Sequence, residues 1–176
     1  MKPSFETYGK VPPQAKDLEQ ATLGAILLEL DAFDVISGIL KPECFYVESH
    51  QIIFKACQRL SEKNQPIDIF TVCEELKGDL EKVGGKYYVT QLTNSVVSSV
   101  NAETHAKIIL QKYVQREIIR ISGELIQNAY EDMCDPLELL AQAESQLSQA
   151  TESYSFGDMV PISNVLVKAL KEINEN

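Results

Sequence analysis

Few residues of this sequence stand at spacings that could support catalysis. The two histidines, His50 and His105, are too far apart for an HxxxH or HExxH metal site. His50 follows Ser49 at the expected start of a helix, so we expect a hydrogen-bonded structural side chain. Glu74 and Glu75 are adjacent on an expected helix and point in different directions, unlike an acid–base pair that shares a substrate. We expect both carboxylates to face solvent.

The Gly-Gly-Lys sequence at 84–86 does not match a phosphate-binding loop. Such a loop needs an earlier glycine at a set spacing and a Ser or Thr after the lysine, whereas Tyr87 follows here. The sequence also has no GxSxG nucleophile elbow and no close CxxC pair. The cysteines are expected to be small buried hydrophobes in a reducing compartment; they are Cys44, Cys57, Cys73 and Cys134. The sequence predicts no catalytic, metal or cofactor site, although an enzyme using Glu74, His50 or a cysteine stays open as an alternative.

The 176-residue chain is acidic, with 16 Lys and Arg against 26 Asp and Glu and a net charge of -10. This charge opposes direct binding of nucleic acid or anionic lipid. No Lys or Arg occurs between Arg120 and Lys168, where several acidic residues stand. That stretch is either a solvated acidic helix face or a surface that attracts a basic protein partner. The start of the chain lacks a signal-peptide core, and no apolar run approaches membrane-spanning length, so we expect a folded cytosolic protein.

Helical spacing of apolar residues dominates the first hundred residues. The predicted helices cover 14–28, 32–40, 49–60, 69–76 and, as a helix or mixed segment, 87–97. Pro42 follows the second helix, Asp68 is placed to cap the fourth, and Gly84-Gly85 predicts a turn before the fifth. We expect a helical head over 14–100 after a flexible leader at 1–13, with minimal strand content.

The pattern changes at Asn101. From there to about residue 130, apolar residues recur at threes and fours and predict one helix roughly 45 Å long. Asp135-Pro136 begins a second helix with coiled-coil-like spacing, so an antiparallel hairpin is expected over 101–153. The apolar stripe of the first arm is too wide for a single partner helix, which favours pairing with a second subunit. Residues 154–176 are expected to hold a linker and an amphipathic linker helix without a place in the core.

The order of these signals resembles the N-terminal domain of the bacterial replicative DNA helicase, the DnaB family. The resemblance runs from about Pro12 to Ser153, and the final helix resembles the linker of that family. It rests on Glu19-Gln20-Ala21-Thr22-Leu23-Gly24, Leu40-Lys41-Pro42-Glu43-Cys44-Phe45-Tyr46, His50-Gln51-Ile52-Ile53-Phe54, Pro66-Ile67-Asp68-Ile69-Phe70-Thr71-Val72, Val83-Gly84-Gly85 with Tyr88, and Asn101. Leu18 departs from the pattern, since the family usually has Ala at this position.

The resemblance implies an all-α collar without enzymatic activity of its own, in the cytoplasm at the replication fork. The expected partners are a second copy, within a hexameric trimer of dimers, the C-terminal domain of primase, and the motor domain of the adjacent subunit. ATP and Mg²⁺ would bind in a motor domain that this sequence lacks, DNA would be touched weakly or indirectly, and no membrane contact is expected.

The candidate residues for self-association or primase docking are Ile109, Tyr113, Arg116, Ile119, Leu140, Glu144 and Leu147. Whether they pair subunits or only join the two arms of the hairpin stays open. The candidate residues for docking of the linker helix on the motor are Val165, Leu166 and Leu170. The alternative function is a free-standing helical adaptor or regulator, such as a small-ligand sensor, whose hairpin closes on its own head.

Overall fold

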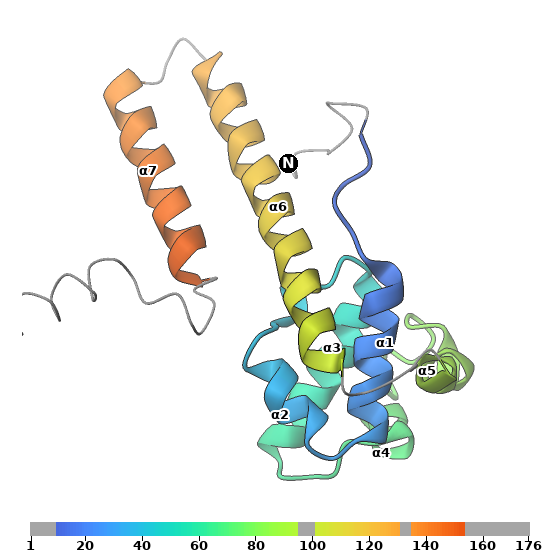
Figure 1. Ribbon diagram of the computed structural model, residues 1–176. Coiled ribbons are helices and arrows are strands. Elements are labelled where there is room, and N and C mark those ends of the chain that lie inside the picture. The colour runs from blue at the N-terminus through green and yellow to red at the C-terminus, as the bar shows by residue number, and fades with distance from the viewer. Residues whose placement is uncertain (1–9, 95–100, 131–134, 154–176) are drawn as a thin grey trace, which may run out of the picture. The chain divides into compact units, whose positions relative to one another are not determined.

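The computed structural model describes residues 10–94, 101–130 and 135–153 (Figure 1). Within these ranges the regular elements are seven α-helices and a short 3₁₀ helix, and no strand occurs. The elements are α1 (Lys16–Leu28), α2 (Ala32–Ser37), η2 (Pro42–Cys44), α3 (Glu48–Glu62), α4 (Ile69–Glu75), α5 (Gly85–Asn94), α6 (Ala102–Ala129) and α7 (Pro136–Ser153). The all-α fold predicted from the sequence is confirmed. The chain divides into two compact units, 1–122 and 123–176.

The observed helices follow the predicted ones closely. α1 begins at Lys16, and α2 ends at Ser37, before the predicted Leu40. Pro42 follows the second helix as expected, and it also opens the 3₁₀ helix η2, which the sequence analysis did not anticipate. The segment expected as a helix or mixed structure near Tyr87 is the helix α5. The predicted linker helix lies outside the described residues.

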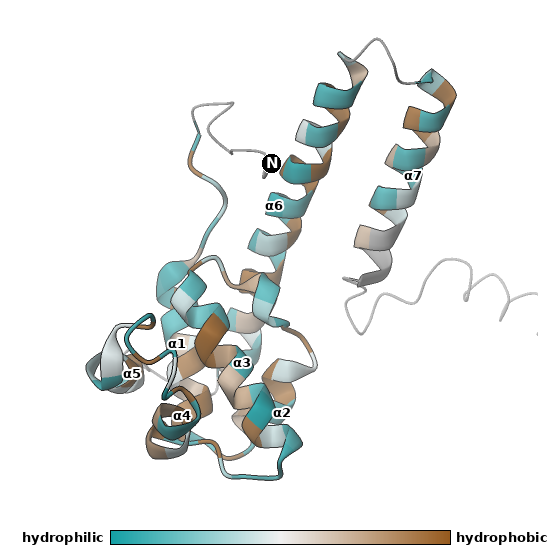
Figure 2. Ribbon diagram, turned by 180° about the vertical axis from the view of Figure 1, so that it is seen from behind, coloured by the Kyte–Doolittle hydropathy of each residue, from teal (hydrophilic) through white to brown (hydrophobic). Residues whose placement is uncertain are grey.

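Apolar faces of α1 to α5 and of the first part of α6 form the core of the first unit. Phe33, Phe45 and Phe54 are buried, and the ring centroid of Phe54 lies 5.6 Å from that of Phe33 and 5.1 Å from that of Phe45. Such tilted aromatic pairs favour one packing arrangement beyond the gain from buried area alone. Leu23 and Ile26 of α1 are also fully buried. Hydrophobic residues accordingly colour much of α3 and α4 in Figure 2.

Local capping fixes the start of α4. Oδ1 of Asp68 accepts hydrogen bonds from the backbone N–H groups of Phe70 (2.8 Å) and Thr71 (2.9 Å). Oγ1 of Thr71 in turn accepts from the N–H of Asp68 at 2.9 Å, which completes a reciprocal capping box. The predicted cap is confirmed. The predicted glycine turn is also present, since Gly84 and Gly85 have φ angles of 93° and 73°, which favour glycine.

The buried side chains of the long helix α6 lie between Ala102 and Ile121. Ala102, Ala106, Ile109 and Leu110 are buried near its start, and Ile121 is the last apolar side chain of α6 in the core. Both α6 and α7 carry hydrophilic and hydrophobic residues along their length (Figure 2). The amphipathic character of both helices agrees with the sequence prediction for the two arms.

Candidate functional site

A buried polar network joins three helices of the head. Glu19 of α1 and His50 of α3 are 1% and 0% exposed, and Nδ1 of His50 lies 2.7 Å from Oε2 of Glu19. Nε2 of His50 lies 2.7 Å from the hydroxyl oxygen of Tyr88 on α5. The Glu19 carboxylate also accepts hydrogen bonds from the backbone N–H groups of Tyr46 (2.7 Å) and Val47 (3.3 Å). Every ring nitrogen of His50 therefore has a partner, and the structural role predicted for this histidine is confirmed.

Glu19 is a residue whose importance the sequence analysis missed. It lies on the same helical face as Leu23 and Ile26, four and seven residues later, and both are fully buried. A carboxylate on an otherwise apolar face requires compensating donors, because burial of an unpaired charge is very costly. The place of Glu19 on the apolar face of α1 could have predicted a buried, hydrogen-bonded carboxylate. It could not have identified His50 as the partner.

Arg116 of α6 is also buried, with 7% of its surface exposed. Its Nη1 donates to the carbonyl oxygen of Pro13 at 2.8 Å, and its Nη2 donates to that of Cys44 at 2.7 Å. The rings of Tyr46 and Tyr113 each lie 5.5 Å from the guanidinium carbon. Burial lowers the pKa of Arg116, and the nearby Glu19 charge opposes that shift. Arg116 thus ties α6 to the segment before α1 and to η2.

The seven residues predicted for self-association or primase docking do not share one environment. Ile109 is 1% exposed, so it and Arg116 lie in the core of the head and are not available as surface contacts. Tyr113 is partly buried against Arg116. The remaining four are exposed; they are Ile119, Leu140, Glu144 and Leu147.

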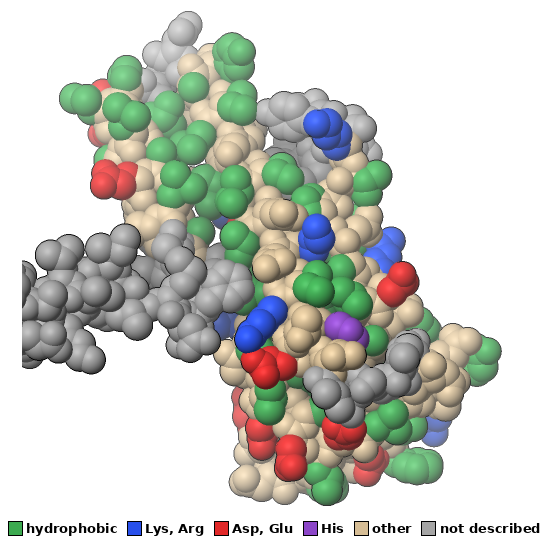
Figure 3. All heavy atoms as spheres, in the orientation of Figure 1, with side chains coloured by type: hydrophobic (Ala, Val, Ile, Leu, Met, Phe, Trp, Pro, Cys, Tyr) green, Lys and Arg blue, Asp and Glu red, His purple; other side chains and the backbone are tan. Residues whose placement is uncertain are grey.

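Large apolar side chains are exposed on both long helices. On α6, Ile118 is 48% and Ile126 is 46% exposed, and on α7 Leu137 and Leu140 are 73% and 67% exposed. Figure 3 shows hydrophobic side chains gathered over both helices. Several large apolar side chains exposed along the same helices are typical of a protein-interaction surface rather than of a solvated helix face.

The remaining chemical candidates have structural partners. Glu75 corrects our expectation of a solvent-facing charge, because its side chain is 16% exposed and its two oxygens lie 2.7 Å from Nε of Arg59 and Nζ of Lys63. Hydrogen bonds from Lys63 and Arg59 lower the pKa of Glu75. Glu74 is 68% exposed and pairs with Lys77, as expected for a surface charge.

The described cysteines are buried, as predicted. Burial raises the pKa of the Cys57 thiol to about 12, and it also raises the pKa values of Cys44 and Cys73. These thiols are therefore protonated and poor nucleophiles at neutral pH. Cys134 lies outside the described residues, as do Val165, Leu166 and Leu170.

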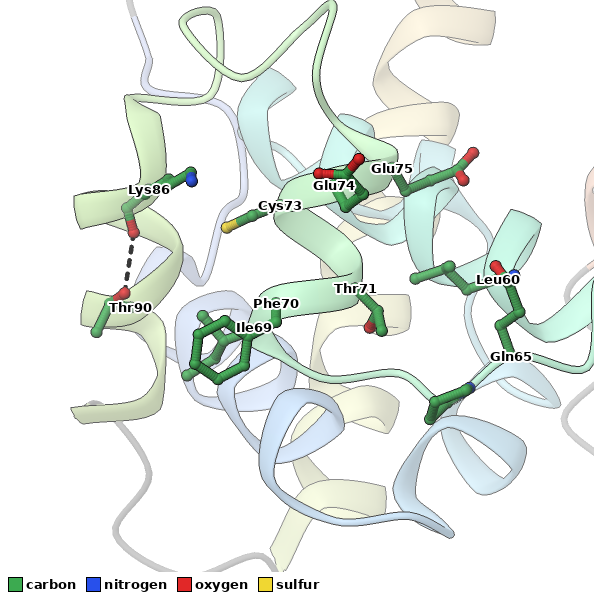
Figure 4. A pocket seen from close by; sticks show the side chains of 11 residues that line it. Leu60, Gln65, Ile69, Phe70, Thr71, Cys73, Glu74, Glu75, Lys86 and Thr90 are labelled. Carbon is green, nitrogen blue, oxygen red and sulfur yellow. Dashed lines mark hydrogen bonds between the residues drawn. The ribbon is translucent and has the colours of Figure 1, made fainter.

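A pocket of about 690 Å³ lies between α4, α5 and the end of α3. Figure 4 shows Cys73 of α4 and Lys86 of α5 extending toward one another, with Leu60 and Gln65 on the other side of α4. The lining has no nucleophile paired with a base. Within the described part of the chain, no group of three or more His, Cys, Asp or Glu residues could hold a metal ion. None of the described helices combines the length and the apolarity needed to cross a bilayer.

The fold is an all-helical domain with exposed apolar side chains on its two long helices. The chain belongs to the family of DnaB-like helicase N-terminal domains, whose family model matches residues 11–111. The resemblance seen in the sequence is therefore confirmed. The matched part of these helicases is the N-terminal domain and not the motor.

The curated relatives that share this segment include the following two. The replicative DNA helicase DnaB of Rhodothermus marinus is 40% identical over 169 residues, which are 95% of this chain and 17% of that protein. The replicative DNA helicase DnaC of Bacillus subtilis (strain 168) is 35% identical over 168 residues, 94% of this chain and 37% of that protein. The chain thus spans much less than half of the length of either relative.

The solved structures that are similar to this chain include the following two. The N-terminal domain of DnaB helicase from Mycobacterium tuberculosis has a TM-score of 0.74 and 30% identity, and the match covers 79% of this chain and 99% of that one. A structure of a DnaB-like replicative helicase and its interactions with primase has a TM-score of 0.65 and 26% identity, covering 92% of this chain and 35% of that one.

Proposed function

We propose that this chain is the N-terminal collar of a hexameric replicative DNA helicase, where it pairs subunits and docks primase at the bacterial replication fork in the cytoplasm. The observation that carries this proposal is the family membership together with the exposed apolar side chains of α6 and α7. In the proposed assembly, DNA unwinding and the binding of ATP and Mg²⁺ belong to a motor domain that the matched N-terminal domain does not include. The net charge of -10 favours protein partners over direct contact with DNA.

The proposed pairing surface uses the exposed residues of the two long helices. Ile119 is 37%, Leu140 67% and Leu147 47% exposed, and Glu144 is also exposed. Covering these side chains with the same helices of a second copy removes apolar surface from water, which favours association. Ile109 and Arg116 support this surface from inside the head and do not contact the partner. The trimer of dimers and the docking of 154–176 on an adjacent motor domain complete the proposed arrangement.

Primase docking is proposed because one similar structure is that of a DnaB-like helicase and its interactions with primase. Within the stretch after Arg120 that has no Lys or Arg, Asp135, Glu138 and Glu144 are exposed and supply a surface charge that suits a basic partner.

Sedimentation velocity of variants tests the pairing surface. Leu140→Asp should shift the monomer–dimer equilibrium toward the monomer by at least about tenfold, because a charge would be buried in the interface. Gln142→Asp is the matched control, since it adds the same charge at an exposed polar position of α7. Equal association of the two variants would contradict the proposed surface.

A further inference from the structure

The connection between α1 and α2 exposes apolar side chains that the core does not use. Leu28 is 55%, Leu30 85% and Val35 50% exposed, whereas Ala32 and Phe33 between them are buried. We call the exposed set the α1–α2 corner; it comprises Leu28, Glu29, Leu30, Asp31, Asp34 and Val35. All six lie within eight consecutive residues, so apolar and acidic side chains are exposed together on this short connection.

The charge of the α1–α2 corner is entirely negative. Glu29, Asp31 and Asp34 are exposed, and the sequence has no Lys or Arg between Lys16 and Lys41. None of the ion pairs in the described part of the chain involves these three carboxylates. In Figure 3, Asp and Glu side chains gather over the end of the head where α1 meets α2. The corner therefore presents negative charge that the head does not neutralise.

The C-terminus of α1 adds to this negative potential. A helix ends with free carbonyl groups and a partial negative charge, which Lys or Arg in the last turn usually balances. The last turn of α1 has no basic residue, and Glu29 occupies its C-cap. Among the described backbone N–H groups, that of Glu29 donates to Ala25, and none after it donates to the last turn. The partial negative charge at this end of α1 thus lies beside the exposed carboxylates of the corner, with no basic residue of the last turn to balance it.

We infer that the α1–α2 corner docks a basic amphipathic helix of a partner protein, on a surface separate from the pairing surface of α6 and α7. Lys or Arg side chains of that helix would reach Glu29, Asp31 and Asp34, while its apolar face covers Leu28, Leu30 and Val35. Leu30 is the central anchor, because it is the most exposed apolar side chain of the corner. A phosphate-rich partner, such as nucleic acid or an anionic membrane, would be repelled by the same carboxylates.

The test uses the 176-residue chain and an 18-residue peptide of leucine and lysine whose leucines occupy one helix face. In ¹H–¹⁵N NMR titrations the peptide should shift the amide resonances of residues 28–35. Leu30→Ser should weaken this site about tenfold, and Glu29→Lys with Asp34→Lys should abolish it. Glu81→Lys is the control, because Glu81 is an exposed acidic residue outside the corner. The same peptide with glutamate in place of lysine should not bind.

Three outcomes would overturn the inference. The first is a set of corner resonances that the lysine peptide leaves unchanged, and the second is binding confined to α7. The third is a shift of the corner resonances with protein concentration alone, which would assign the corner to a second copy of this chain. Retention of the remaining amide pattern in each variant shows that the head is folded, so a loss of binding reports on the surface.

Discussion

Nδ1 of His50 lies 2.7 Å from Oε2 of Glu19, and both side chains are buried. The hydroxyl of Tyr88 completes the contacts of the imidazole, so one buried network connects α1, α3 and α5. The network holds together the head from which α6 extends. The carboxylate and the imidazole bind one another, the backbone and Tyr88, which indicates a structural role for the network.

Glu19→Gln should lower the free energy of unfolding by about 3 kcal/mol, because it leaves buried donors of His50 and of the backbone without a charged acceptor. Urea denaturation followed by circular dichroism measures this change. Glu103→Gln is the control, since Glu103 is 55% exposed and pairs with Lys107 on the same helix; it should cost less than about 0.5 kcal/mol. A Glu19→Gln variant as stable as Glu103→Gln would contradict the structural role of the network.

Arg116→Lys should destabilise the head by about 2 kcal/mol, although the charge is kept. Lysine cannot donate to the carbonyls of Pro13 and Cys44 with the planar fork of arginine, nor stack as well on Tyr46. Arg120→Lys on the same helix is the matched control, because Arg120 pairs with Glu117 one turn away. Thermal unfolding should show a clear loss of stability only for Arg116→Lys. Equal losses of stability in the two variants would mean that the guanidinium of Arg116 does not bind the carbonyls of Pro13 and Cys44.

Asp68→Ala should cost about 1 kcal/mol, because the N–H groups of Phe70 and Thr71 lose their capping acceptor. Asp68→Asn should retain most of the stability, since an amide oxygen can accept the same hydrogen bonds. Chemical denaturation of the two variants measures the difference. A stability loss for Asn as large as that for Ala would show that the cap does not act through its side-chain oxygen.

The pairing of Glu75 with Lys63 and Arg59 predicts a dependence of stability on pH. Its pKa is lowered in the folded state from an ordinary value of 4.5, so folding stabilises the charged form. This contribution is complete above the unfolded pKa and is lost as pH falls through the folded pKa. The stability advantage of the natural chain over Glu75→Gln should therefore shrink in acid below pH 4.5. Denaturation curves at several pH values test this, and an advantage that grows as pH falls would contradict the pairing.

The helices of the head could be predicted from sequence because their signals are local. The apolar spacing, the Asp68 cap and the Gly84-Gly85 turn each involve neighbours within one or two helical turns. The same local information places His50 at the start of a helix and favours a satisfied side chain there. It does not identify Glu19 as the partner, because 31 residues separate the two and only the tertiary packing joins them.

The candidate interface residues also show that local sequence patterns do not predict tertiary packing. Ile109 and Ile119 share the predicted apolar stripe of α6, yet packing against the head buries Ile109 and leaves Ile119 exposed. Periodicity defines the stripe, but it does not show where along the helix the head ends. Glu75 was misjudged for a similar reason, since its partners Arg59 and Lys63 come from α3 and the residue after it. The sequence pattern also did not reveal the exposed α1–α2 corner.

The most direct test of the proposed collar is sedimentation equilibrium of the purified chain, alone and with the C-terminal domain of the cognate primase. The weight-average mass should rise above the monomer mass of 19.7 kDa with increasing protein concentration, and it should rise further when the primase domain is added. A mass of 19.7 kDa at every concentration of the chain alone would contradict the pairing. A mixture with the primase domain that shows only the masses of the two separate proteins would contradict the docking.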